Sequence, residues 1–159
     1  MWPRIAAGIV AGLTVLGAAS ASAAAEDNLA FVDPTRTQSA IDQASNALTS
    51  VLSYEYRTLD ANIEQARQKG TEQYARAHTD IVNKNRATAT KQKQTVAVKV
   101  VGVGVKTLNP NSAQLLVFLD QTTTRGDTNK SATVGIAAIV EVRLLDGQWK
   151  LDSVSNTVS

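Results

Sequence analysis

Residues 95–105 read TVAVKVVGVGV, and this stretch decides the type of fold. Val96, Val98 and Val100 alternate with other residues, which is the period of a β-strand that buries one face. The valines at 101, 103 and 105 alternate in the opposite phase. A phase shift of one residue inside a strand indicates a β-bulge or a bend, and Gly102 lies at the shift. We therefore predict a long strand that bends at Gly102.

Three further strands are predicted downstream of this one. Asn109-Pro110-Asn111 is a turn signal, and residues 113–124 form a second apolar, strand-like run. Residues 134–144 carry an apolar side chain at every second position, which predicts a long third strand. Asp146-Gly147 is the strongest hairpin signal in the chain, because a two-residue type I′ turn needs residues that tolerate positive φ. A fourth strand then begins at Trp149.

Upstream of the strands, apolar residues recur at helical spacing. Asp33-Pro34-Thr35 is typical of a helix N-terminus. The apolar stripe that follows, on which residues 53–56 also fall, comprises Ile41, Ala44, Leu48, Val51, Leu52 and Leu59. A second helix is predicted over Asp60–Lys69 with Gly70 as its stop, and Thr71 is placed to cap a third helix. Helices followed by antiparallel strands predict an α+β fold, in which about three helices pack on one face of a bent four-stranded sheet and form a cone or half-barrel.

The N-terminal part of the chain carries an uncharged run, Ile5–Ala25, which follows the single positive charge of Arg4. About 20 apolar residues are enough to cross the hydrocarbon core of a membrane. The same run also fits an export signal, since Ala21-Ser22-Ala23 resembles a small-residue cleavage site. Both alternatives leave the rest of the chain outside the cytoplasm. We divide the sequence into a membrane anchor or signal segment (1–25), a linker and helix start (26–37) and an extracytoplasmic α+β domain (38–159).

Composition excludes several classes of site. The sequence has no cysteine and one histidine, so disulfides, thiolate metal sites and multi-histidine metal sites are excluded. No phosphate-binding loop surrounds Gly102 and Gly104, because the strand, glycine loop and helix order of such loops is missing. The net charge of +2 and the export segment argue against nucleic acid as a partner. We expect no cofactor and no metal.

Two groups of residues are candidates for catalysis. His78 lies on the predicted third helix with Asp80 as its nearest acid, and we interpret it as a surface or half-buried structural residue. Asp120 ends the second predicted strand, and inside a cone it could act as a base while Tyr54 or Tyr56 polarises a carbonyl group. No motif supports this second arrangement, and we interpret Asp120 as the polar end of the strand.

A basic segment is the strongest candidate for partner contact. Residues 83–119 contain six basic residues and no acidic one. The candidate contact residues are Lys84, Arg86, Lys91 and Lys93. Such an excess suits an acidic partner or an anionic lipid surface, although runs of charge are often only a solvated surface. The polar loop Thr122–Lys130 is a second candidate.

The sequence resembles the Mce-associated membrane proteins, which are actinobacterial envelope proteins linked to Mce-type lipid importers. The resemblance covers nearly all of residues 28–158. It rests on an ordered set of short matches: residues 28–33, Thr37, 53–56, Leu59, Gly70, Tyr74, 91–93, 101–103, Ala113, 116–121 and 147–150. The family usually has a longer cytoplasmic tail, whereas only Met1-Trp2-Pro3-Arg4 precede the uncharged run here.

The resemblance implies a single-pass protein whose extracytoplasmic domain is like the nuclear-transport-factor cone. It implies a non-enzymatic accessory or stabilising subunit of an Mce-type lipid import complex, with Mce and permease subunits as partners and the membrane reached through the N-terminal helix. Secretion after signal cleavage is the alternative location. There are two alternative functions. One is a small-molecule binder or enzyme that uses the cone cavity, and the other is an assembly subunit of a secretion channel. The family supplies no catalytic residues.

Overall fold

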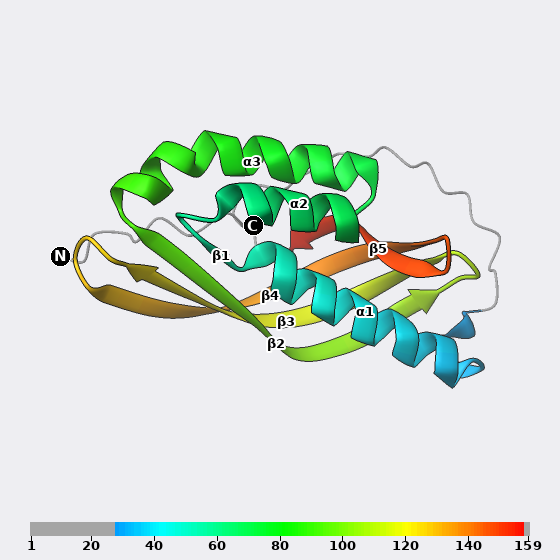
Figure 1. Ribbon diagram of the computed structural model, residues 1–159. Helices are drawn as coiled ribbons and strands as arrows, with labels where there is room; N and C mark the ends of the chain where they lie inside the picture. Colours follow the sequence, from blue (N-terminus) through cyan, green and yellow to red (C-terminus); the bar gives the residue numbers. More distant parts are fainter. Residues whose placement is uncertain (1–27, 158–159) are drawn as a thin grey trace.

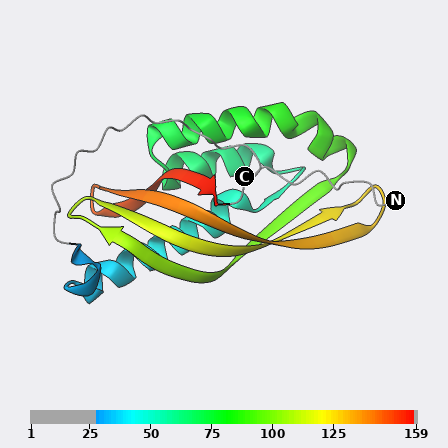
Figure 2. The same ribbon diagram turned by 180° about the vertical axis from the view of Figure 1, so that it is seen from behind.

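A computed structural model of the chain describes residues 28–157. The predicted anchor or signal, Ile5–Ala25, lies outside the described residues. Within the described part, no helix combines the length and the apolar character that crossing a membrane requires. The described chain forms an α+β fold with its helices on one side of a curled antiparallel sheet (Figures 1 and 2).

The sheet has five strands in the order of the sequence, and all neighbours are antiparallel. The strands are β1 (Tyr54–Glu55), β2 (Gln94–Leu108), β3 (Ser112–Arg125), β4 (Lys130–Leu145) and β5 (Gln148–Asn156). The four predicted strands are β2 to β5, and β1 is additional. It is formed by two residues that the sequence pattern assigned to a helical stripe. They pair with Val96 and Thr95 because the first helix already ends at Leu52.

The bend of β2 is confirmed at the predicted position. The register between β2 and β3 shifts between Val100 and Gly102, and it shifts again between Val105 and Thr107. Val101 is the extra residue of the first bulge and is exposed, while Val103 and Val105 of the second phase pack against the core together with Val96 and Val98 of the first. The predicted Asp146-Gly147 hairpin is also present, with φ values of 51° and 76° that match the positive φ needed by a type I′ turn.

Three α-helices and one short 3-10 helix precede or interrupt the strands. They are η1 (Leu29–Phe31), α1 (Pro34–Leu52), α2 (Leu59–Lys69) and α3 (Glu72–Lys91). Helix α1 contacts both β2 and β5, so the sheet curls around it, and α2 packs on α3 above (Figure 1). The inner faces of α1 and the sheet form one apolar core. Its fully buried members include Ala44, Leu48, Leu115, Val117, Val140 and Leu151.

The helix boundaries follow from local chemistry. Thr71 accepts a hydrogen bond from the backbone N–H of Tyr74 at 3.3 Å, so the predicted N-cap of α3 is formed. Asp33 accepts one from the backbone N–H of Arg36 at 2.9 Å and caps α1 at the predicted helix start. Gly70 separates α2 from α3. A Cβ atom at Gly70 would lie only 2.5 Å from a ring carbon of Tyr74, so close packing of the third helix requires glycine here.

Candidate interaction surface

The two predicted contact regions meet at one end of the molecule. The backbone N–H of Gly126 donates to the carbonyl of Lys93 at 3.1 Å, and that of Asp127 donates to the carbonyl of Gln92 at 3.3 Å. These bonds join the C-terminus of α3 to the turn between β3 and β4, which lie together in Figure 1. We name the combined surface, formed by residues 91–93 and 125–130, the distal end.

The distal end carries an excess of positive charge. Arg125 forms a two-point ion pair with Asp127, with N–O distances of 3.2 and 2.9 Å, and this pairing lowers the pKa of the Asp127 carboxyl group. The pair is internally neutral. Lys91 and Lys93 are exposed, and so is Lys130, whose backbone pairs with that of Arg125 across the hairpin. Three ammonium groups therefore remain to meet a partner.

The two other candidate contact residues lie further back along α3. Lys84 is exposed and precedes Lys91 by two helical turns, which places it on the same side of α3, about 10 Å away. Arg86 points toward α2 instead. It donates to Asp60 at 2.6 Å and to Asn83 at 3.2 Å, so its charge is already engaged within the domain. The structure thus brings Lys91 and Lys93 together with the hairpin, and sets Arg86 apart.

Strand β4 starts at the distal end, and the first half of its outer edge has no partner strand among the described residues. Strand β5 pairs with β4 only over Ala138–Leu145, so the first half of β4 extends beyond it. The carbonyl of Ala137 accepts from Thr157, which shows that odd-numbered residues of β4 direct their backbone groups away from β3. Ser131, Thr133 and Gly135 continue this alternation, and among residues 28–157 no strand pairs with that side of them. The sequence pattern does not predict this edge, because it does not show how far β5 pairs along β4.

His78 is a structural residue, but it is more deeply buried than predicted, with 1% of its surface exposed. The amide nitrogen of Asn62 donates to the carbonyls of Val51 at 2.7 Å and Ser53 at 2.9 Å, so the Asn62 oxygen accepts from Nε2–H of His78 at 2.8 Å. Burial lowers the pKa of His78 to about 4. The ring is therefore neutral at pH 7, and it ties α3 to the end of α1.

The catalytic alternative, in which Asp120 meets tyrosines inside the cone, does not hold, and Asp120 lies exposed within β3 rather than at its end as we interpreted it. Leu115, Val117 and Leu119 occupy the inner face of β3, so alternation places Asp120 on the outer face, where it is exposed. Tyr54 lies on the other side of the sheet. Its hydroxyl donates to the Gln94 side-chain oxygen at 2.8 Å, and burial raises the pKa of Tyr54 to about 12.

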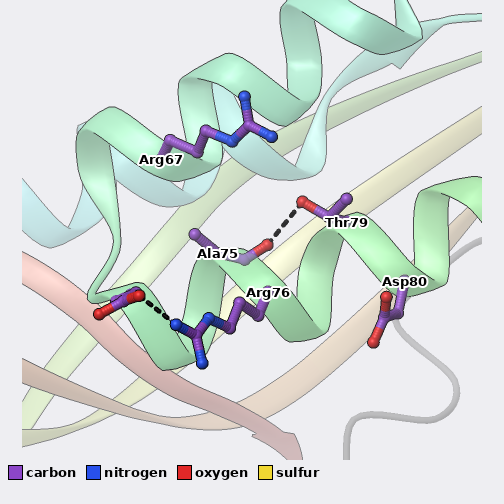
Figure 3. A pocket seen from close by; sticks show the side chains of 6 residues that line it. Arg67, Ala75, Arg76, Thr79 and Asp80 are labelled. Carbon is purple, nitrogen blue, oxygen red and sulfur yellow. Dashed lines mark hydrogen bonds and ion pairs between the residues drawn. The ribbon is translucent and has the colours of Figure 1, made fainter.

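A surface depression between α2 and α3 has a volume of about 600 Å³ (Figure 3). Its arginines already have acidic neighbours, since Arg76 pairs with Glu72 and Arg67 lies 3.5 Å from Glu64. The hydroxyl of Thr79 donates to the backbone carbonyl of Ala75 at 2.7 Å. The depression thus offers paired charges rather than an activated nucleophile or base. Among the residues that the structure describes, no group of acids and histidines could hold a metal ion.

Sequence comparison finds related proteins but no matching family model. Two uncharacterized proteins, from two strains of Mycobacterium tuberculosis, are 31% identical over 118 residues. The match covers 74% of this chain and 54% of each relative, so the chain spans about half the length of the curated relatives it matches.

Structure comparison finds the same cone in several solved proteins. An IcmL-like type IV secretion system protein from Legionella pneumophila has a TM-score of 0.65 at 15% identity, over 78% of this chain and 93% of its own. CagV from Helicobacter pylori, a VirB8 homolog, has a TM-score of 0.60 at 13% identity, over 74% and 96%. A nuclear-transport-factor-2-like protein from Prochlorococcus marinus has a TM-score of 0.54 at 10% identity, over 77% and 91%. At these identities the likeness establishes the fold, and it confirms the cone predicted from the sequence.

Proposed function

We propose that this protein is a non-enzymatic accessory subunit of an Mce-type lipid import complex, held at the cell membrane by its N-terminal segment. The resemblance described above supports the transporter, and the uncharged run Ile5–Ala25 supports the membrane location. The single observation that carries the mode of action is the distal end, where the backbone bonds of Lys93 and Gln92 join two basic segments into one surface. Mce and permease subunits are the proposed partners.

The geometry favours contact with protein rather than chemistry on a substrate. The open edge of β4 offers the backbone groups of Ser131, Thr133 and Gly135 to an extended segment of a partner, which is a common route to protein recognition. The ammonium group of Lys130 lies at the start of this strand, and Lys91 and Lys93 lie on the other side of the β3–β4 hairpin, where Gly126 joins Lys93. These charges would attract acidic residues. An extended, acidic segment of a transporter subunit therefore matches both features.

Capture from membranes tests this proposal. A tagged full-length chain should recover Mce and permease subunits, and the variant Lys91→Glu/Lys93→Glu/Lys130→Glu should recover at least about tenfold less, since reversed charges repel an acidic partner. Each single reversal is also captured, and Arg67→Glu is the control for one reversal, because Arg67 is an exposed cation outside the distal end. Full recovery by the triple variant would remove the distal end from the mechanism. Absence of Mce and permease subunits from the unaltered chain's captures would refute the transporter.

A second candidate function is assembly of a secretion channel. The solved structures that share the cone include the IcmL-like protein and CagV, which are described as type IV secretion system proteins. This candidate predicts secretion-channel subunits in the same captures, and secretion genes beside the gene for this chain. Mce operon neighbours would instead favour the import complex.

A further inference from the structure

Two adjacent apolar side chains are exposed at the end of the molecule opposite the distal end. Phe31 closes η1 and is 88% exposed, and Val32, which links η1 to α1, is 71% exposed. These are the largest exposed fractions among the large apolar residues of the described chain. We name the surface formed by residues 28–33 and the turn 109–111 the proximal end. It lies beside the turns that join β2 to β3 and β4 to β5 in Figure 1.

The fold imposes this exposure, because the segment is tied firmly to the sheet. The side chain of Asn28 accepts from the backbone N–H of Leu108 at 2.9 Å and donates to the carbonyl of Lys106 at 2.9 Å. Thr37 donates to the carbonyl of Ala30 at 3.1 Å, and Arg36 donates to the carbonyl of Pro110 at 2.9 Å. Leu29 and Ala30 pack against the core while Phe31 points outward. The segment that the sequence assigned to a linker thus orients Phe31.

The short distance in sequence between Asn28 and the uncharged run indicates what meets Phe31 and Val32. Only Glu26 and Asp27 separate Asn28 from the uncharged run that ends at Ala25. Three peptide units span at most about 10 Å, so Asn28 lies within that distance of Ala25. The headgroup layer on each side of a bilayer is about 5–8 Å thick. If the run lies in the membrane, the proximal end therefore meets the headgroup layer.

We propose that Phe31 and Val32 insert into the interfacial layer of the bilayer that holds the N-terminal segment. The occupant of this surface is lipid, and the inference rests on the membrane location in the proposed function. Apolar side chains at this depth leave water while the neighbouring backbone stays in the headgroup region. Because residues 28–37 are fixed on the sheet, insertion sets the orientation of the whole domain. The fourteen residues of β3 then hold the distal end about 40 Å above the membrane, where it meets protein rather than lipid.

Single-cysteine labelling of the full-length chain tests this orientation, since the sequence contains no cysteine. Phe31→Cys carries an environment-sensitive nitrobenzoxadiazole label, and the chain is reconstituted into vesicles of phosphatidylcholine and phosphatidylglycerol. Val134→Cys is the control, because Val134 is also an exposed apolar residue, with 57% of its surface exposed, but lies on the distal half of β4. Both sites are exposed, so neither label disturbs the core.

The label at residue 31 should shift to shorter emission wavelength in vesicles and should be quenched by lipids that carry a nitroxide near the headgroup. The label at residue 134 should show neither effect. If the chain floats with the vesicles but the label at 31 behaves as in water, or is quenched no more than the label at 134, the orientation is overturned and the membrane location stands. If the chain fails to float with the vesicles, the membrane location in the proposed function is overturned together with it.

Discussion

Acidification should destabilise the domain through one residue, His78. The unfolded chain binds a proton on this ring near the ordinary pKa of 6.5, whereas the folded chain keeps the ring neutral down to about pH 4. The unfolded state therefore binds more protons between these values, and the free energy of unfolding falls as the pH falls from 6.5 toward 4. One pKa unit corresponds to 1.36 kcal/mol, so the full loss is about 3 kcal/mol.

The loss can be separated from the titration of carboxyl groups by working between pH 7 and pH 5. Over this interval the linkage relation gives a loss of about 2 kcal/mol from His78. Urea unfolding followed by circular dichroism would show this as a decrease of the midpoint by about 1 M, for a denaturant slope near 2 kcal/mol per M. His78 is the only histidine in the sequence, so no second imidazole contributes.

His78→Gln is the matched control for this prediction. Its side-chain amide can still donate to Asn62, as Nε2–H of His78 does at 2.8 Å, but it does not titrate. The variant should therefore lose about 2 kcal/mol less stability than the unaltered chain between pH 7 and pH 5. An unaltered chain with the same unfolding midpoint at both pH values would refute the reasoning, and so would an equal decrease in the variant.

Three further substitutions probe the packing. Gly70→Ala should destabilise the domain by about 1–3 kcal/mol in urea unfolding, because the added methyl group meets the Tyr74 ring, and an unchanged midpoint would contradict the close approach. Asn62→Leu should cost about 3 kcal/mol or more by the same assay, since it strips the donor from two backbone carbonyls and the acceptor from His78. Gly126→Ala places a Cβ atom 2.9 Å from the Cβ atom of Lys93. It should lower partner capture while the free energy of unfolding changes by only about 1 kcal/mol. Undiminished capture would show that the contact between Gly126 and Lys93 is not needed for binding.

The cone was predictable because its determinants are local in the sequence. The phase shift of the valines at Gly102 shows the bend directly, since a bulge changes which side chains face the core. Asp33 and Thr71 show their helix starts because a cap needs only the three residues that follow it. The two-residue strand Tyr54–Glu55 was missed, because it exists only through pairing with a segment 40 residues away.

The candidate surface was predictable only in part. Lys91 and Lys93 were marked by the charge pattern, but their junction with the β3–β4 turn depends on backbone bonds between distant segments. Arg86 has the same charge as its neighbours on α3. Only the packing of α2 against α3 shows that Arg86 forms an ion pair with Asp60. The exposure of Phe31 could not be predicted either, because an apolar residue before a helix more often packs inward.

The sequence by itself determined the α+β class, the bend, the helix caps and the absence of cysteine, since each depends on residue type and short-range spacing. The tertiary structure alone decided which residues share a surface. It placed Asp120 outside the cone, buried His78 against Asn62, and set the basic and apolar ends at opposite ends of the sheet. The physical reason is that strand pairing and helix packing bring together residues far apart in the chain, and the local pattern carries no information on those partners.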